Sequence, residues 1–373
     1  MKILMLSNCT TVESQGSGYV IVNTGRCLEE QGHEVNLVSS DKISLFSFLG
    51  STAVIYRMMA GMAWWIITND IKKYDRIIFY GGESALAVFL LKKVLRRKIP
   101  VILHSNGLEL LVTYNLTLNE LMNENKKKWY HFKNTFLFNY CYKTVDLIIT
   151  VSKSERDLAI NKLGINPNKI FYNNLALPNF YFNKIPLSRN KKLITFCGTW
   201  IERKGVDAIK KAMPTILKTH PEYKFRIIGV GNNFNVHQHF TEEIIDQIEV
   251  IPFVEDKMEL MNLYTDSAVF LFPSISESFG LVVAEAMYCG CALISGPTGF
   301  AAELHNRKEA VILDKPHAEN IILAIDMLIN DEKLRARIAI SGQEKVKNLT
   351  WLNYSKKLRD ILNSLELPTI KSS

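Results

Sequence analysis

The sequence has few cysteines, and none of its six lies in a Cys-x-x-Cys pair or at a spacing typical of metal ligands. Most of them lie in apolar segments, where a cysteine behaves as a small hydrophobic residue. The amino terminus also lacks the long apolar run of a signal peptide, because MKILMLSN turns polar after a few residues. These absences argue against a disulfide framework. They favour a reducing compartment, and we expect the chain to stay in the cytoplasm.

Short apolar runs alternate with longer segments along the whole chain. In the first half the runs are KILMLS, EVNLVSS, DRIIFYGG, PVILHS and DLIITVS, and in the second half KKLITFCG, YKFRIIGVG, IEVIPFV, AVFLFPS, CALISG and AVILD. Such alternation is typical of parallel sheets covered by helices on both faces. We therefore expect an α/β fold with two Rossmann-like doubly wound domains, and ligands in the crevice at the carboxyl ends of their strands.

The stretch NNLALPNFYFNKIPLSRN, residues 173–190, interrupts the alternation and is rich in Pro and Asn. We interpret it as a linker between a first domain over residues 1–178 and a second over residues 179–350. A run of helices is expected from about Ala318 to Leu365.

One segment, Leu45–Ile67, is about long enough to cross a bilayer, but it carries Arg57 in its middle. It also lies where the first domain needs a crossover helix, so a membrane span would disrupt the sheet. These features favour a buried or cleft-lining helix. An interfacial element with Trp64 and Trp65 at the level of lipid head groups is the second interpretation, and a transmembrane span is the third.

The positive charge is concentrated in the first half of the chain. Residues 1–180 carry 21 Lys and Arg against 14 Asp and Glu, whereas residues 181–373 carry 24 against 23. The excess lies between Ile71 and Lys133, in the segments IKKYDR, LKKVLRRK and ENKKKWYHFK, where aromatic residues accompany the cations. Such a surface suits phospholipid head groups, an anionic glycan or nucleic acid. Solvated helix faces explain the same pattern.

Two adjacent cations, Arg203 and Lys204, lie at the expected start of a helix near Gly205. Cations at a helix amino terminus oppose the helix dipole by roughly 0.3–1 kcal/mol each. Their presence there suggests an anion from outside, for which phosphate is the usual candidate. Neutralisation by Glu202 and solvent is the alternative.

The segment SISESFGLVVAEAMYCG contains two glutamates in different settings. Glu277 lies in a loop, and Glu285 lies about two turns into an apolar helix that ends near Gly290. Because burying an unpaired carboxylate is costly, Glu285 needs a partner that this helix does not supply. A vicinal diol such as a ribose offers two donors. A buried ion pair with a lysine or arginine from elsewhere is the alternative.

The stretch from Ile251 to Leu304 resembles glycosyltransferase family 4, the retaining nucleotide-sugar transferases of GT-B fold. The match includes the two glutamates, the residues PS before them, EAM-x-CG after them, and Gly299 with Glu303 downstream. The segments RKGVD, IIGVG and LTWLNYSKKLRDIL are also similar to the family, so the resemblance covers the second half. In the first half it is carried by GSG at residues 16–18, EEQGHEVNLVS and IPVILHSNGLE.

The resemblance implies a role for each matching residue of the second domain. Arg203 and Lys204 would neutralise the donor diphosphate, Glu285 would hold the ribose, and Glu277 would grip hydroxyls of the transferred sugar. The remaining donor-binding residues would contact the sugar, the phosphates or the base: Gly229, Gly231, Phe253, Val254, Ser278, Phe279, Gly280 and Leu281. The family usually has an arginine where this chain has Thr199.

In the first domain the resemblance assigns three residues. Gly16 and Gly18 would open a loop over the donor phosphates, and His104 would reach the reacting sugar as a catalytic residue. The fold implied is GT-B, with a helix over residues 351–373 that packs back on the first domain.

The reaction implied is transfer of a hexosyl group from a nucleotide sugar, such as a UDP-sugar, to a glycan or lipid-linked acceptor in bacterial cell-surface polysaccharide or glycolipid synthesis. No metal or other cofactor is expected, and the absence of any Asp-x-Asp argues against the metal-dependent GT-A architecture. We expect the acceptor at the inner membrane surface, with peripheral contact through the basic first domain, and no nucleic-acid partner.

Three other classes remain as alternatives. A nicotinamide oxidoreductase would share the Rossmann halves, but Gly16-Ser17-Gly18 lacks the third glycine of G-x-G-x-x-G. A nucleic-acid-binding or DNA-modifying protein would use the basic first domain, with strongly salt-dependent binding. A non-catalytic glycan-binding scaffold would need a broken donor site, yet the two glutamates and both cations are present.

Overall fold

The computed structural model describes residues 1–12, 16–43, 54–108, 111, 136–183 and 191–365. The chain forms two compact units. Among the described residues, unit 1 comprises those up to Leu175 together with those from Trp351 onward, and unit 2 comprises those from Ala176 to Thr350. Each unit contains one parallel six-stranded sheet, which confirms the expected α/β class.

The strands of unit 1 are ordered β2-β1-β3-β4-β5-β6. Their bounds are β1 Lys2–Leu6, β2 Glu34–Val38, β3 Arg76–Tyr80, β4 Val101–His104, β5 Leu147–Thr150 and β6 Ile170–Tyr172. The first five are the apolar runs predicted from the sequence. The sixth was not predicted, because it is only three residues long and directly precedes the stretch interpreted as a linker.

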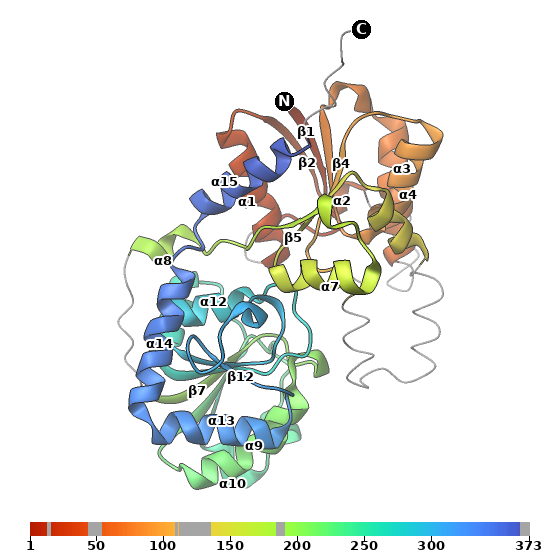
Figure 1. Ribbon diagram of the computed structural model, residues 1–373. Helices are drawn as coiled ribbons and strands as arrows, with labels where there is room; N and C mark the ends of the chain where they lie inside the picture. The colour runs from red at the N-terminus through yellow and green to blue at the C-terminus, as the bar shows by residue number, and fades with distance from the viewer. Residues whose placement is uncertain (13–15, 44–53, 109–110, 112–135, 184–190, 366–373) are drawn as a thin grey trace. The chain divides into compact units, whose positions relative to one another are not determined.

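Helices cover both faces of this sheet (Figure 1). They are α1 Gly16–Glu30, α2 Ser40–Ile43, α3 Val54–Thr68, α4 Ala85–Phe89 with its π-helical continuation η5 Leu90–Val94, α7 Lys153–Leu163 and α15 Trp351–Asn363. Short 3-10 turns lie at Ile71–Lys73, Gly82–Ser84 and Pro167–Lys169. Successive side chains of β1 point to opposite faces of the sheet, and both faces are packed. Leu4 and Leu6 join the core cluster that includes α3 and α4, whereas Met5 lies by Gly25 of α1.

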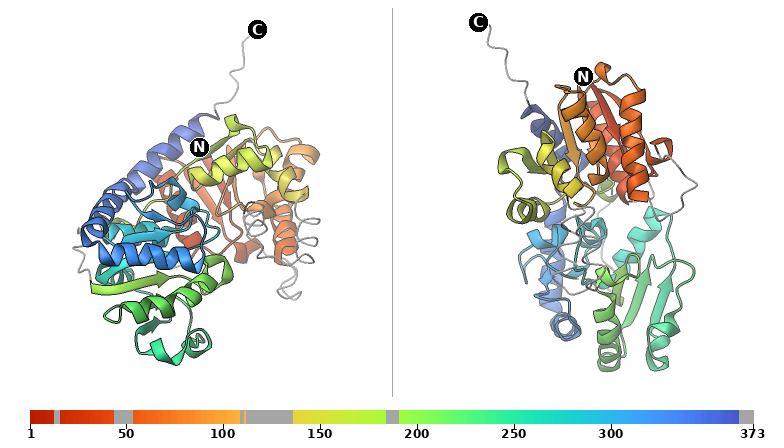
Figure 2. Two further views of the ribbon diagram at one scale, coloured as in Figure 1. Left: turned by 60° about the horizontal axis from the view of Figure 1, so that its bottom comes forward. Right: turned by 90° about the vertical axis from the view of Figure 1, so that its right-hand side faces the viewer.

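Helix α3 contains the described part of the segment with bilayer-spanning length, and residues 45–53 of that segment lie outside the described residues. Met58, Met62 and Ile66 are buried in the core cluster, and α3 packs beside α4 (Figure 2). Trp65 packs partly against the same core, whereas Trp64 is 55% exposed. No helix in the described ranges has the length and apolar character needed to span a membrane.

Helix α15 returns to unit 1 and packs beside α1, as the resemblance implied. The Tyr354 hydroxyl lies 2.8 Å from Thr24 Oγ1 and 2.9 Å from His104 Nε2. Farther along the helix, Gln31 Nε2 donates to Ser355 Oγ at 2.7 Å, and Arg76 Nη1 donates to the Leu362 carbonyl at 2.7 Å. The helix is therefore bonded to α1, to the end of β4 and to β3.

The strands of unit 2 are ordered β12-β11-β10-β7-β8-β9. Their bounds are β7 Lys191–Cys197, β8 Lys224–Ile228, β9 Ile248–Ile251, β10 Ser267–Phe272, β11 Ala292–Ser295 and β12 Val311–Ile312. All six correspond to the predicted apolar runs. The carboxyl ends of β10, β7, β8 and β9 are therefore consecutive along one edge of the sheet.

Helices and strands of unit 2 alternate from the first strand to β11, and two consecutive helices follow β12. The helices are α8 Asn179–Asn183, α9 Val206–Thr219, α10 Glu242–Ile245, α11 Lys257–Asp266, α12 Leu281–Tyr288, α13 Ala318–Asn330 and α14 Glu332–Val346. Short 3-10 turns lie at Glu202–Lys204 (η7), Val236–Gln238 and Gly299–Glu303 (η9). Helix α8 lies inside the stretch interpreted as a linker. That stretch is thus partly helical, because Leu177 and Tyr181 are buried and Tyr181 packs edge-on against Tyr288.

Removing the Tyr354 hydroxyl tests whether its hydrogen bonds to Thr24 and His104 stabilise the packing of α15 on unit 1. Tyr354→Phe removes one oxygen and leaves two buried polar side chains, Thr24 and His104, without this partner. We expect a loss of about 1–3 kcal/mol in the free energy of unfolding, measured by urea denaturation. The control is Tyr56→Phe on α3, where the side chain is 43% exposed and the change should be near zero. Equal stability of the two variants would contradict this account.

Candidate functional site

The candidate site of unit 2 lies where β7, β8, β9 and β10 end. Gly229 and Gly231 follow β8 and both have a φ of +83°, a left-handed conformation that suits glycine. Their N–H groups donate to the carbonyls of Ile251 and Pro252, so the segments that follow β8 and β9 lie side by side. Phe253 and Val254 follow on the same edge, and the Phe253 side chain is 61% exposed while Val254 is buried.

Gly205 brings the loop after β7 close to the exit of β10. Its φ is +75°, and a Cβ atom there would lie 2.2 Å from the Pro273 carbonyl oxygen. Only glycine fits this approach. It places Arg203 and Lys204 beside the loop that leads from β10 to α12, and the Ile275 N–H donates to the Arg203 carbonyl at 2.9 Å.

The side chains of Arg203, Lys204 and Glu277 form one ion cluster. Glu277 Oε1 lies 2.6 Å from Lys204 Nζ and 3.0 Å from Arg203 Nη1, and it also accepts from Ser274 Oγ at 2.8 Å. The Glu277 side chain is only 11% exposed. The partner of the two cations is therefore Glu277 rather than Glu202, whose side chain is exposed.

The loop that carries Glu277 is pinned on both sides. The Glu277 N–H donates to Thr298 Oγ1 at 2.7 Å, and Arg203 Nη1 donates to the Ser276 carbonyl at 2.6 Å. A Cβ atom at Gly299 would lie 2.5 Å from the Phe279 carbonyl oxygen, so η9 begins in close contact with this loop. The side chains of Thr298 and Arg203 thus hold the backbone at Glu277 and Ser276, which sets the position of the carboxylate.

The amino terminus of α12 begins directly after this loop. Gly280, with a φ of +84°, is its N-cap and supplies no capping side chain. The first turn follows with Leu281, while Phe279 is buried beside Phe300 at 5.3 Å between ring centroids. Ser278 lies in the loop between Glu277 and Phe279, before the N-cap. The residues predicted to meet the sugar or phosphate thus form a helix amino terminus, where backbone N–H groups favour anions.

Glu285 is buried in α12, with 5% of its surface exposed. Because the helix begins at Leu281, Glu285 lies little more than one turn in, rather than the two turns expected from the sequence. Burial raises the pKa of its carboxyl group, against which the Lys257 ammonium and the Tyr264 hydroxyl act more weakly. Within the described ranges no lysine or arginine forms an ion pair with it. The buried ion pair considered as an alternative is therefore absent from the described residues, and the need for a partner remains.

Gly16 and Gly18 lie in unit 1, in the first turn of α1 rather than in an open loop. A Cβ atom at Gly18 would lie 2.3 Å from the Val12 carbonyl oxygen, whereas one at Gly16 would meet nothing within 4 Å. Gly18 thus allows the segment after β1 to cross closely over α1. Contact of either glycine with donor phosphates stays a prediction.

His104 ends β4 in unit 1 and is fully buried. Its Nε2 lies 2.9 Å from the Tyr354 hydroxyl and its Nδ1 3.1 Å from the Ser105 carbonyl oxygen, and its ring lies by that of Tyr80. Burial lowers its pKa to about 4. Both ring nitrogens are thus occupied inside unit 1, and its catalytic role stays a prediction. Asn106, two residues on, is the first partly exposed side chain after β4.

Three residues that sequence reasoning missed support the site of unit 2. Ser274 and Thr298 bond to Glu277, and Lys257 faces Glu285 electrostatically. Ser274 lies three residues before Glu277, which is a weak local signal. Thr298 and Lys257 come from distant segments, so only the packing of η9 and α11 reveals their roles.

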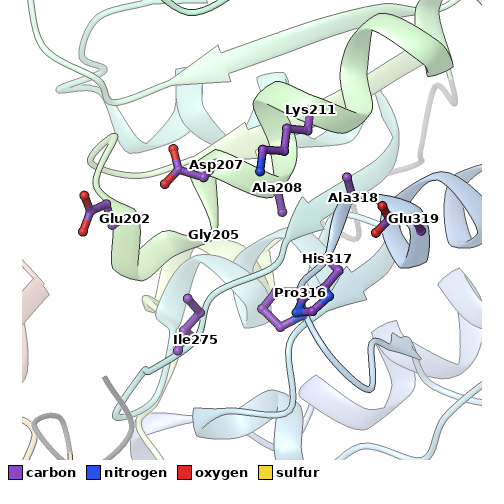
Figure 3. A pocket seen from close by; sticks show the side chains of 10 residues that line it. All are labelled: Glu202, Gly205, Asp207, Ala208, Lys211, Ile275, Pro316, His317, Ala318 and Glu319. Carbon is purple, nitrogen blue, oxygen red and sulfur yellow. The ribbon is translucent and has the colours of Figure 1, made fainter. Parts of the chain in front are cut away.

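A pocket of about 350 Å³ lies beside this site, at the amino termini of α9 and α13 (Figure 3). None of the predicted site residues lines it. Its wall contains three carboxylates and one lysine, together with Gly205, Ala208, Ile275, Pro316, His317 and Ala318; the charged residues are Glu202, Asp207, Glu319 and Lys211. This balance of charge is unfavourable for a diphosphate.

Metal ligation has no counterpart in the described part of the chain, where no three His, Cys, Asp or Glu side chains come together as a metal ion would require. The charged groups near the amino terminus of α12 are instead the cations of Arg203 and Lys204 and the carboxylate of Glu277. Such groups suit an anionic ligand with oxygen acceptors.

Comparison with known families identifies the class. The profile described as "Glycosyltransferase Family 4" matches residues 14–172, and that described as "Glycosyl transferases group 1" matches residues 179–345. Together they span both units. The chain belongs to glycosyltransferase family 4 and has the GT-B fold, as the resemblance implied.

Individual relatives are distant in sequence. One component of the human phosphatidylinositol N-acetylglucosaminyltransferase is 20% identical over 94% of this chain and 73% of its own. Sucrose-phosphate synthase from Thermosynechococcus elongatus has a TM-score of 0.78 at 14% identity, covering 98% of this chain and 99% of that one. Anabaena HepE in complex with UDP-glucose has a TM-score of 0.69 at 15% identity, covering 98% and 100%. At these identities the solved structures are similar in fold.

The buried imidazole of His104 predicts a pH dependence of stability. Its folded-state pKa of about 4 lies below the ordinary value of 6.5, so the unfolded chain binds this proton first as the pH falls. Stability is then lost from about pH 6.5 down to about pH 4. Between pH 7 and pH 5, His104→Gln should lose about 2 kcal/mol less than the unmodified chain in urea unfolding. Identical losses would mean that His104 is not neutral in the folded state.

Proposed function

We propose that the chain transfers a hexosyl group from a nucleotide diphosphate sugar to a hydroxyl of a glycan or lipid-linked acceptor. The transfer retains the anomeric configuration and needs no metal ion. The observation that carries this proposal is the ion cluster of Arg203, Lys204 and Glu277 at the amino terminus of α12. Family membership supports it.

In this proposal the diphosphate binds where the two cations meet the helix terminus. Glu277 holds Arg203 and Lys204 in place before the donor arrives, since its Oε1 contacts both. As the bond to the sugar breaks, negative charge grows on the phosphate oxygens, and fixed cations and backbone N–H groups stabilise it. Stabilisation of this kind is usually the largest single contribution to catalysis.

The nucleoside part of the donor has two groups of residues available to it. The ribose diol donates to the buried carboxylate of Glu285, which supplies the hydrogen-bond partners that α12 lacks. The exposed ring of Phe253 offers a flat surface for the base, and Gly229 and Gly231 let it approach the backbone. Uridine is the favoured base, because the similarly folded HepE is in complex with UDP-glucose.

The donor site is tested by three substitutions. Lys204→Ala, Glu277→Gln and Glu285→Ala should each lower donor hydrolysis and transfer by about 10²-fold, since each removes a charge-assisted contact. The readout is release of nucleoside diphosphate from a panel of nucleotide sugars, with thermal shift as the measure of donor binding.

The matched control is Lys218→Ala, which removes an exposed lysine near the end of α9 that pairs with Glu243. It should leave both rates unchanged. If Glu285→Ala and Lys204→Ala both keep full hydrolysis and transfer, the assignment of the donor site is wrong.

The acceptor side of the proposal rests on the outer surface of α3 and α4. These adjacent helices expose Trp64, Ile67 and Phe89, each at 42% or more. Their carboxyl ends lead into the neighbouring strands β3 and β4, where the exposed cations gather: Lys72, Lys73, Lys93, Arg96 and Lys98. Apolar side chains flanked by cations suit the surface of an anionic membrane.

The human relative is named for phosphatidylinositol, which agrees with a lipid-linked acceptor. The lysines 126–128 of the basic segment lie outside the described residues.

Membrane contact is tested by sedimentation with phosphatidylcholine vesicles that contain or lack phosphatidylglycerol. The chain should bind the anionic vesicles, and the pair Lys72→Gln and Lys73→Gln should weaken binding by about 1 kcal/mol per charge. Trp64→Ser should weaken it further. Control variants in unit 2 are Lys218→Gln and Leu323→Ser, both at exposed positions. Vesicle binding that is absent, or unchanged in all variants, would refute the membrane contact.

A further inference from the structure

The carboxyl ends of three adjacent strands of unit 1 carry a polar cluster that is separate from His104. The loop after β1 contributes Asn8 and Cys9, the loop after β3 contributes Glu83, and the loop after β4 contributes Asn106. All four side chains are partly exposed. Because β1, β3 and β4 are neighbours in the sheet, their exits converge on this cluster.

Direct contacts join the four side chains into one surface. Asn8 Nδ2 donates to Glu83 Oε2 at 3.1 Å, and the Cys9 thiol lies 3.5 Å from Asn8 Oδ1. On the other side, Asn106 Nδ2 lies 3.8 Å from Cys9 Sγ. A Cβ atom at Gly81 would lie 2.3 Å from both Asn8 Nδ2 and Glu83 Oε2, so the Asn8–Glu83 contact requires glycine at this position.

The loop that carries Asn106 is fixed by the buried carboxylate of Glu155. Glu155 Oε1 accepts from Ser105 Oγ at 2.8 Å and from the Leu108 N–H at 2.7 Å, and its Oε2 accepts from the Val151 N–H at 3.2 Å. Ser105 Oγ in turn accepts from the Gly107 N–H at 2.8 Å. Asn106 is therefore held between two anchored residues. A binding group in this position loses little freedom when a ligand arrives.

The composition of the three loops indicates what kind of ligand fits. Residues 7–12, 81–84 and 105–108 contain no lysine or arginine, so in this described part of the three loops an anionic group would meet the carboxylate of Glu83 and no cation. A carboxylate accepts hydrogen bonds and an amide both donates and accepts them. This combination suits an uncharged vicinal diol, which donates to the carboxylate and accepts from an amide.

We propose that Asn8, Glu83 and Asn106 form the subsite that binds hydroxyls of an acceptor sugar. The proposal rests on the proposed transferase function and extends it to the acceptor side. One hydroxyl donates to Glu83, and a neighbouring one accepts from Asn106 Nδ2. Asn8 orients the Glu83 carboxylate and is a positioning residue. No bond is made or broken by these side chains.

Substitutions in the subsite should affect transfer to an acceptor but not hydrolysis of the donor. Glu83→Gln and Asn106→Ala should lower kcat/KM for transfer to octyl glycosides of glucose, galactose, mannose and N-acetylglucosamine by about tenfold to hundredfold, through KM for the acceptor. Donor hydrolysis by water, and KM for the donor, should stay within about twofold of the unmodified chain, because the proposal assigns both side chains to the acceptor. Matched controls are Glu34→Gln and Asn168→Ala, both at exposed positions of unit 1.

Alkylation of Cys9 gives a second readout that does not depend on turnover. Of the six cysteines, all of which are described, Cys9 alone is not buried. Iodoacetamide should therefore label it first, as judged by mass spectrometry, and a bound octyl glycoside should slow that labelling. In Glu83→Gln the protection should be lost.

The outcomes distinguish the two proposals. A chain that releases no nucleoside diphosphate from any donor fails as a transferase, while protection of Cys9 by a glycoside would still support the subsite. A chain that hydrolyses donor but transfers equally well as Glu83→Gln and Asn106→Ala refutes the subsite alone. Absence of both transfer and protection for all four glycosides refutes it as well. Thermal unfolding of each variant shows whether a loss comes from misfolding.

Discussion

The carboxylate of Glu277 is the interaction on which the site of unit 2 depends. Two cations on one short turn repel each other and oppose the dipole of the helix that follows them. Glu277 neutralises part of that charge from a loop 73 positions farther along the chain and leaves the cluster with a net positive charge. The close packing at Gly205 and the hydrogen bond from the Glu277 N–H to Thr298 set the position of this ion cluster. A diphosphate would find the cations already placed, so little reorganisation would be needed when charge develops.

Most of the sheet architecture could be predicted from the sequence, because buried parallel strands are continuous apolar runs. Eleven such runs became strands. β6 was missed since three residues at a sheet edge carry too little pattern, and α8 was missed since its burial depends on Tyr288, more than one hundred residues away. The setting of Glu285 was predictable for a local reason: its neighbours in the helix are apolar, and the structure leaves its carboxylate buried without an ion pair among the described residues.

Side-chain partnerships between distant segments could not be predicted in the same way. Sequence proximity offered Glu202 as an alternative counter-ion of Arg203 and Lys204, whereas the fold supplies Glu277. The resemblance assigned His104 to the reacting sugar, and nothing in the sequence indicated that Tyr354 contacts its ring from a helix 250 positions later. The cluster of Asn8, Glu83 and Asn106 has no sequence spacing that marks it, since three loops meet only when the sheet order is known.

The return of α15 to unit 1 has a consequence for how the chain is made. Residues 176–350 interrupt unit 1 in the sequence, so a ribosome completes unit 2 before it releases the last helix of unit 1. Until then Thr24 and His104 lack the Tyr354 hydroxyl, and the apolar face of α1 lacks its neighbour. Unit 1 is thus the first unit to begin synthesis and the last to be completed. A message truncated shortly before codon 351 would yield a finished unit 2 joined to an unfinished unit 1, a product that quality control can recognise by its exposed apolar surface.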